Sequence, residues 1–390
     1  MTRTTLVRAG VASLSVLALG ALNLPGLGAT TLPGTARWRP QTVRSCTPAA
    51  TVARWNINRL IEQLIVIPVD QAALAQAKIE VTAGVGGMIL TGSPPPDLKY
   101  QISSVLKAAP DGIAPLVMTD EEGGAVQRLS PLIVNVPAAR TMGSTMAPSA
   151  IERLARALAL SMRGLGVTMD LAPVADVDAR PGPSTVNADG TRSFSGDTAA
   201  ASRDALAFAA GLERGGVIPV IKHFPGLGGT IANTDLAVAS TPPWAVVEKS
   251  GLIPFERAIA AHIPAMMVSN AVIPGLSKTP ASLSRVVVTK ELRARLHFRG
   301  LLLTDSLSAV AITHAHYSLG KAVVAALLAG EDMVLFNVDT ADLSRTTTAI
   351  VLAVRSALAN GSISRVQIEH AAAMVLSAKH IARCAAPIHP

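Results

Sequence analysis

Phe298-Arg-Gly-Leu-Leu-Leu-Thr-Asp-Ser-Leu-Ser308 determines how the rest of this sequence is interpreted, because an uninterrupted apolar run leads straight into a carboxylate. Continuous apolar residues without alternation are typical of a parallel strand that is covered on both faces. Asp305 is therefore expected at the carboxyl end of a strand. In an α/β barrel this is the end where the loops converge and the chemistry is done. The alternative is that Asp305 caps a helix beginning near Leu307.

Eight apolar runs of this kind occur along the chain, and amphipathic stretches of helical periodicity separate them. Alternating strands and helices imply a parallel sheet, and eight such units in about 330 residues predict a closed (β/α)8 TIM-type barrel of the α/β class with a single catalytic domain. An open doubly wound sheet is the alternative, but no Gly-x-Gly-x-x-Gly follows the first run. The predicted strands are Leu64–Val69, Val85–Leu90, Ala114–Thr119, Val167–Ala172, Ile218–His223, Ala265–Ser269, Leu301–Thr304 and Asp332–Phe336.

The composition agrees with such a barrel. The chain has 390 residues, of which 49% are apolar and only 3% aromatic, so its interior should be filled by small and branched aliphatic side chains. The formal net charge is +8, and the basic residues are scattered along the sequence. This pattern argues against nucleic-acid binding and predicts mild attraction to an anionic cell envelope.

The first residues resemble a secretory signal. Arg3 and Arg8 precede the apolar run Val11–Leu22, and small residues follow up to position 29. We therefore predict a signal peptide over residues 1–29 and export from the cytoplasm, followed by a tether over residues 30–50. An uncleaved N-terminal anchor is the alternative.

The catalytic barrel is predicted to span residues 51–384, with a short tail over residues 385–390. The sequence contains two cysteines, Cys46 and Cys384, near the two ends of this domain. An oxidising compartment would allow them to form a disulfide, and a closed barrel brings its first and last elements together. Two unrelated thiols are the alternative.

Polar residues gather where the third and fourth predicted strands end. Thr119-Asp-Glu-Glu-Gly-Gly-Ala-Val-Gln-Arg128 combines three acids with a Gly-Gly turn, which makes Asp120 and Arg128 candidates for the barrel mouth. A long loop over residues 178–197 contains Arg192 beside a phenylalanine, and loops of this length are usually functional or disordered.

The fifth predicted strand delivers Lys222 and His223 side by side, and Asp235 follows in the next loop. Lysine is costly to bury unless it meets an oxygen atom, so a polar site is expected there. The predicted barrel would place Asp235 and Asp305 on opposite sides of its mouth, with cationic donors around them. This arrangement fits glycosidic bond cleavage, in which one carboxylate attacks and the other carboxyl group supplies the proton. An ordinary turn residue is the alternative role for Asp235.

Six motifs occur in order along the chain. They are Thr119-Asp-Glu-Glu-Gly-Gly-Ala-Val-Gln-Arg-Leu129, Ala172-Pro-Val-Ala-Asp-Val177, Arg192-Ser-Phe194, Lys222-His-Phe-Pro-Gly226, Pro280-Ala-Ser-Leu-Ser284 and Leu303-Thr-Asp-Ser-Leu307. Together they resemble the motifs of glycoside hydrolase family 3, and the likeness is strongest to the bacterial β-N-acetylglucosaminidases of peptidoglycan turnover. The resemblance covers about residues 60–382.

This resemblance implies a retaining glycoside hydrolase in which Asp305 is the nucleophile. The expected substrate is a small carbohydrate or muropeptide, and nothing in the sequence implies a metal or an organic cofactor. The chain is expected to act as a monomer. The resemblance also implies that five residues hold the hydroxyl groups of the sugar: Asp120, Arg128, Arg192, Lys222 and His223.

The sequence departs from the family in the loop that carries the acid/base dyad. The family has His-Gly-Asp and then Asp-Ser-His there, whereas this chain has Leu227-Gly-Gly229 and Asn233-Thr-Asp235. A further family histidine after the sixth strand is Asn270 here. Asp235 is predicted to replace the dyad as acid/base, because a carboxylic acid can do so if burial or negative charge raises its pKa. The alternatives are a catalytically impaired relative that binds cell-wall sugars without turnover, and a phosphorylase-like activity.

Overall fold

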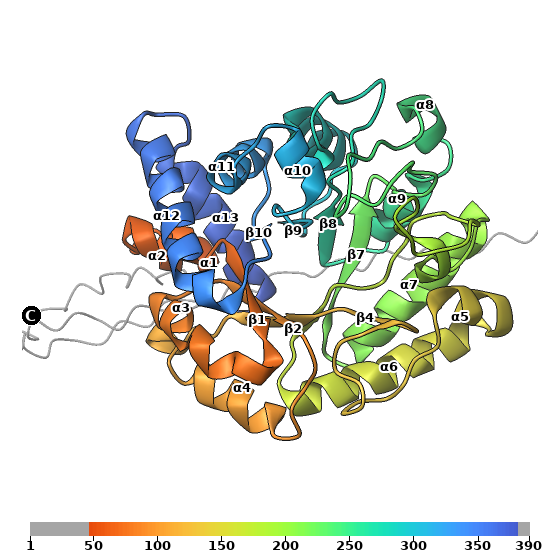
Figure 1. The fold of residues 1–390 in the computed structure, drawn as a ribbon, viewed down its shortest axis with the longest axis horizontal. Coiled ribbons are helices and arrows are strands. Elements are labelled where there is room, and N and C mark those ends of the chain that lie inside the picture. The colour runs from red at the N-terminus through yellow and green to blue at the C-terminus, as the bar shows by residue number, and fades with distance from the viewer. Residues whose placement is uncertain (1–46, 381–390) are drawn as a thin grey trace, which may run out of the picture. The chain divides into compact units, whose positions relative to one another are not determined.

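The computed structural model describes residues 47–380. Eight parallel strands form one sheet in the order β10-β1-β2-β3-β6-β7-β8-β9, and Leu303 of β9 pairs in parallel with Met333 beside β10. The sheet therefore closes on itself, and helices surround it (Figure 1). The predicted (β/α)8 barrel is confirmed and the open doubly wound sheet is wrong. The strands are β1 (Ile65–Asp70), β2 (Gly87–Thr91), β3 (Leu116–Thr119), β6 (Met169–Asp170), β7 (Ile218–Phe224), β8 (Ala265–Val268), β9 (Leu301–Thr304) and β10 (Val334–Leu335).

Each of the eight predicted runs overlaps one of these strands, and β1, β2 and β7 extend one residue beyond the predicted ends. The strands β6 and β10 are only two residues long. Side-chain hydroxyls replace backbone acceptors at both places. Thr168 Oγ1 accepts from the Val117 amide at 2.9 Å, and Thr304 Oγ1 accepts from the Leu335 amide at 3.0 Å. A two-stranded antiparallel hairpin that the sequence analysis did not predict, β4 (Glu121–Gly123) and β5 (Val126–Gln127), lies directly after β3.

The amphipathic stretches between the predicted strands form helices, as expected from their periodicity. One of them, over residues 71–83, divides into a 3₁₀ segment and an α-helix, and another, over residues 286–295, is a π-helix. The helical elements are α1 (Pro48–Val52), α2 (Ile57–Glu62), η1 (Gln71–Ala77), α3 (Lys78–Ala83), α4 (Leu98–Leu106), η2 (Pro110–Gly112), α5 (Ala139–Thr145), α6 (Pro148–Leu165), η3 (Gly190–Arg192), α7 (Thr198–Arg214), α8 (Trp244–Val247), α9 (Ile253–Ala260), η4 (Ala281–Leu283), η5 (Val286–Arg295), α10 (Val310–His314), α11 (Leu319–Ala329), η6 (Thr340–Asp342), α12 (Leu343–Ala359) and α13 (Arg365–Ala378).

Local sequence explains where the long outer helices begin and end. The Asp197 carboxylate accepts from the Ala200 amide at the start of α7, and Ser364 and Gln367 form a reciprocal capping box at the start of α13. Gly166 ends α6 in a left-handed conformation, with φ of 99°, which glycine adopts without strain. Valine, leucine and isoleucine side chains fill the core, as the composition predicted.

The first and last described helices, α1 and α13, pack against each other. Cys46 and Cys384, the predicted signal peptide and the predicted tail all lie outside the described residues, so the disulfide and the export signal remain predictions. No helix between residues 47 and 380 is long and apolar enough to cross a membrane.

Candidate active site

A cavity of about 510 Å³ opens at the carboxyl ends of the barrel strands. Asp120 and Asp305 directly follow β3 and β9, and β7 carries a lysine and a histidine. Parallel strands place all these ends on one side of the barrel, which is why distant motifs meet there. All seven residues that the sequence analysis selected line this cavity: Asp120, Arg128, Arg192, Lys222, His223, Asp235 and Asp305.

A buried ion network forms one wall of the cavity. Lys222 Nζ lies 2.6 Å from Asp120 Oδ1 and 2.7 Å from Glu122 Oε1. Arg192 donates two hydrogen bonds to the same Glu122 carboxylate, at 2.7 and 2.8 Å. Burial alone would raise the pKa of Glu122, but Arg192 and Lys222 outweigh it and hold that pKa well below its usual range. Glu122 was not among the site residues predicted from the sequence, although its carboxylate holds both cations in place.

His223 is held by a second buried carboxylate. Its Nδ1 lies 2.7 Å from Asp176 Oδ2, and Asp176 also accepts from the backbone amides of His223 and Leu227, at 3.2 and 2.7 Å. Burial lowers the pKa of His223 to about 4, so its imidazole is neutral near pH 7. The proton of a neutral ring lies on the nitrogen that faces Asp176, which leaves Nε2 as an acceptor for a sugar hydroxyl.

Asp305 lies at the mouth and not at a helix start. Its Oδ1 accepts from the Ser306 amide at 2.7 Å, and α10 begins five residues later, preceded by Ala309. The helix-cap interpretation is therefore wrong. Asn270, which occupies a family histidine position, donates from Nδ2 to the Ser306 carbonyl at 2.7 Å, and so fixes the backbone next to Asp305. Burial first, and then the charge of Asp235, raise the pKa of Asp305.

Asp235 projects from a loop that is fixed against the barrel. The carbonyls of Thr234 and Asp235 accept from the amides of Ala311 and Val310 at the start of α10, at 3.1 and 3.4 Å. The turn itself is made by Asn233, whose Oδ1 accepts from the Asp235 amide at 3.0 Å. The Asp235 side chain is exposed, but surrounding protein still raises its pKa, with Arg192 opposing and Asp120 adding to the shift. Asn233 therefore makes the bond of a turn residue, while the Asp235 carboxyl lines the cavity.

Arg128 reaches the rim of the cavity on the β4–β5 hairpin and is exposed. Glu121 fixes this hairpin, because its carboxylate accepts from the Leu129 amide at 2.7 Å and lies near the hydroxyl of Thr119, at 3.2 Å. Burial raises the pKa of Glu121 to about 7. Its contacts within the hairpin indicate a structural role.

The sequence model described as "Glycosyl hydrolase family 3 N terminal domain" matches residues 56–378. The chain belongs to glycosyl hydrolase family 3. The resemblance in the motifs is thereby confirmed.

Named relatives agree with this assignment. The beta-hexosaminidase LpqI of Mycobacterium tuberculosis is 36% identical over 301 residues, which are 75% of this chain and 76% of LpqI. The solved structure of LpqI superimposes with a TM-score of 0.77 at 30% identity, covering 86% of this chain and 97% of LpqI. The beta-N-acetylhexosaminidase of Beutenbergia cavernae gives a TM-score of 0.75 at 28% identity, covering 84% of this chain and all of that structure.

A fungal family member also matches. The "uncharacterized secreted glycosyl hydrolase" of Arthroderma benhamiae is 31% identical over 305 residues, which are 75% of this chain and 84% of that protein. Bacterial and fungal proteins therefore share sequence similarity with this chain over about three quarters of its length.

Proposed function

We propose that this family 3 glycoside hydrolase removes β-linked N-acetylglucosamine by a retaining mechanism, with Asp305 as the nucleophile and Asp235 as the acid/base. The observation that carries this proposal is the convergence of two carboxyl groups, a neutral imidazole and a lysine–arginine pair on one cavity. Most retaining glycosidases use a pair of carboxyl groups that flank the scissile bond. The names of the bacterial relatives support the choice of sugar.

The two carboxyl groups can take different protonation states. Both pKa values are raised, and the negative charge of Asp235 is one cause of the shift at Asp305, so the pair holds on to one proton more tightly than isolated carboxyls would. The Ser306 amide donates to Asp305, whereas no described residue donates a hydrogen bond to the Asp235 carboxyl. The proposed mechanism requires the shared proton on Asp235, and the Ser306 amide favours this arrangement because it stabilises the ionised form of Asp305.

The chemistry then follows two steps. An Asp305 oxygen bonds to the anomeric carbon as the glycosidic bond breaks, and the Asp235 proton goes to the leaving oxygen. In the second step Asp235 takes a proton from water, the water oxygen bonds to the anomeric carbon, and the bond to Asp305 breaks. Asp235 is protonated again and Asp305 is again ionised.

The opposite wall supplies hydrogen-bonding groups for the sugar. Lys222 uses two of its three N–H donors on Asp120 and Glu122, and His223 offers an acceptor at Nε2. Asp120 adds carboxylate oxygens and Arg128 adds donors at the rim. Alternating donors and acceptors of this kind suit vicinal hydroxyl groups, which present both.

Peptidoglycan-derived fragments in an extracytoplasmic compartment are the proposed substrates. The sequence has features of an export signal, its net charge is positive, and one fungal relative is named as secreted. An acidic muropeptide would be attracted to such a surface, with little dependence on any single residue.

The decisive experiment measures release of the aryl group from an aryl β-N-acetylglucosaminide by the purified chain and by Asp305→Asn and Asp235→Asn, with Glu331→Gln as a control. Glu331 is a buried acid on the side of α11, away from the cavity-lining residues. Turnover by the parent and control proteins, with loss in both cavity variants, is the expected result. A mechanism-based fluoro-sugar should label Asp305.

Two other outcomes would overturn the proposal. Sugar binding without turnover in every protein would identify a binding relative. Release that requires added phosphate and yields a sugar phosphate would identify a phosphorylase.

A further inference from the structure

Asp189 is a buried acid that the proposed mechanism does not use. It lies on the loop after β6, just before η3, with none of its surface exposed. Neither of its carboxylate oxygens accepts a hydrogen bond from any residue in the described part of the chain. A buried carboxyl group without a donor is costly, so such a group calls for a proton or a ligand.

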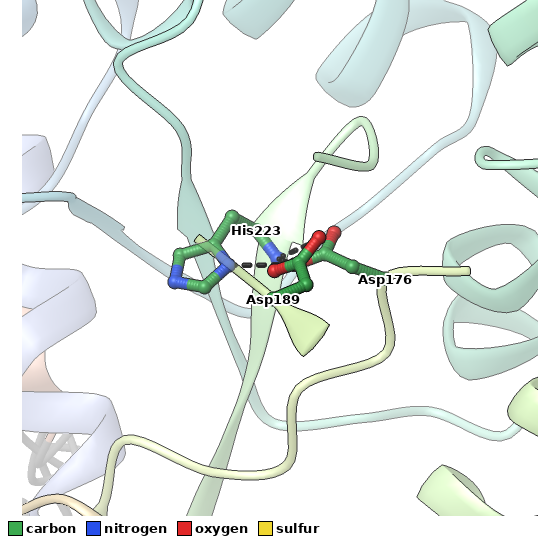
Figure 2. A group of neighbouring side chains, drawn as sticks. All are labelled: Asp176, Asp189 and His223. Atoms are coloured by element: carbon green, nitrogen blue, oxygen red, sulfur yellow. Dashed lines mark hydrogen bonds and ion pairs between the residues drawn. The ribbon is translucent and has the colours of Figure 1, made fainter. Parts of the chain in front are cut away.

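The carboxyl of Asp189 is directed at two other buried side chains (Figure 2). One ligand atom each from Asp176, Asp189 and His223 lie within 4.8 Å of one another. The exposed fractions of the three residues are 0%, 0% and 5%. Figure 2 also shows that the second ring nitrogen of His223 points away from both acids.

The donor set has the character of a zinc site. One imidazole nitrogen with two carboxylate oxygens suits zinc, whereas calcium and magnesium prefer oxygen ligands alone. Ligand atoms at zinc bond lengths of about 2.0–2.2 Å lie roughly 3–4 Å apart. His223 Nδ1 and Asp176 Oδ2, which are 2.7 Å apart, would therefore separate slightly, while the Asp189 carboxylate, within 4.8 Å of both atoms, would move closer. Asp189 can make this movement without losing a hydrogen bond to the described residues. Water would complete the coordination.

The surrounding charges allow a dication. Lys222 and Arg192 are the neighbouring cations, and they are bonded to Asp120 and Glu122. Arg180, on the same loop, is paired with Asp178. These pairs balance one another. Asp176 is bonded to His223 and to two backbone amides, so Asp189 is the carboxyl of this cluster whose oxygens have no donor among the described residues. A divalent ion would bind the two carboxyls and offset their negative charge.

We propose that Asp176, Asp189 and His223 form a zinc-binding site behind the sugar cavity. The ion takes the place of the hydrogen between His223 Nδ1 and Asp176, so the ring hydrogen moves to Nε2. His223 then presents a donor to the cavity where the zinc-free protein presents an acceptor. The site stands independently of whether the chain hydrolyses any sugar.

Isothermal titration of the chelator-treated chain with zinc chloride tests the site, using Asp189→Asn as the variant and Glu331→Gln as the matched control. The asparagine keeps the shape of Asp189 and can donate to Asp176, so folding should survive, and a thermal melt checks this. Glu331 is likewise a buried acid whose carboxylate oxygens lack partners in the described chain, but it belongs to no group of three potential metal ligands among the described residues.

We expect one zinc ion per chain in the parent and control proteins, and an affinity at least about 10–100-fold weaker in Asp189→Asn, since even outer-shell changes cost that much. Equal zinc affinity in the parent and Asp189→Asn, or absence of binding in the parent, would overturn the proposal.

Zinc-edge X-ray absorption of the parent protein gives a second test that needs no variant. The proposed site predicts a shell of nitrogen and oxygen atoms at about 2.0–2.2 Å with the scattering pattern of one imidazole. A sulfur shell at about 2.3 Å would place the ion on Cys46 or Cys384 and would overturn the proposed ligand set.

Discussion

The end of β7 and the loop that follows it form the two sides of one cavity, but they are built in different ways. Lys222 and His223 are buried and bonded to carboxylates that lie after β3, in β4 and in the loop after β6. Asp235 is exposed, and its loop is held mainly through backbone hydrogen bonds. A change on the buried side would leave a charge unpaired, whereas a change on the loop side replaces one exposed group by another. This difference explains how the family motif can remain at β7 while the dyad loop differs.

The largest expected effect tests whether the two sides serve one reaction. Asp305→Asn removes the attacking oxygen, so kcat/KM for an aryl β-N-acetylglucosaminide should fall by at least about 10⁴-fold. Sugar affinity should persist, since the bonds of Lys222 and His223 do not involve Asp305. Initial-rate kinetics and titration with N-acetylglucosamine measure the two quantities. Undiminished turnover would remove Asp305 from the mechanism.

Asp235→Asn should have a smaller effect, because it removes proton transfer but not the nucleophile. A fall in kcat of about 10²–10⁴-fold is expected for a poor leaving group. A dinitrophenyl glycoside, whose leaving oxygen needs little protonation, should recover most of the first step. Equal losses with both substrates would show that Asp235 has a different role.

The barrel was predictable because each strand lies in a continuous run of apolar residues, which can be recognised from the local sequence alone. The short elements α1, α5, α8 and α10 were not predicted, since helices of four to seven residues depend on packing rather than on their own propensity. The β4–β5 hairpin was not predicted, because its glycines and acids are typical of a turn and not of strands.

The site was predictable to the extent that its residues follow strand ends. Glu122, Asp176 and Asp189 were not selected, because they act by bonding other side chains, and such partnerships exist only in the folded chain. Asp189 also lies 13 positions after Asp176, and His223 lies 34 positions after Asp189. Spacings of this kind do not indicate a metal site in a sequence. The sequence did contain one indication that Glu122 has a role in the site. The segment Thr119–Arg128 has three acids, which is more than its turn requires.

Glu122→Gln tests the claim that the β7 side tolerates little change. The variant leaves Lys222 and Arg192 with one negative partner fewer in a buried setting, so the free energy of unfolding should fall by about 3–5 kcal/mol. Glu369→Gln breaks the surface ion pair with Arg365 and should cost only about 0–1 kcal/mol. Urea unfolding measures both. Similar losses in the two variants would contradict the contrast between buried and exposed sides.

The pH dependence of kcat/KM gives the finest test of the loop side. Turnover requires Asp305 ionised and Asp235 protonated, and both pKa values are raised above the ordinary value for aspartate. Activity should rise with pH as Asp305 loses its proton and fall at higher pH as Asp235 loses its own. The raised pKa of Asp235 moves the decrease in kcat/KM to higher pH. This decrease should be absent in Asp235→Asn because an amide does not titrate. Persistence of the same decrease in that variant would assign it to another group and leave Asp235 without a catalytic proton.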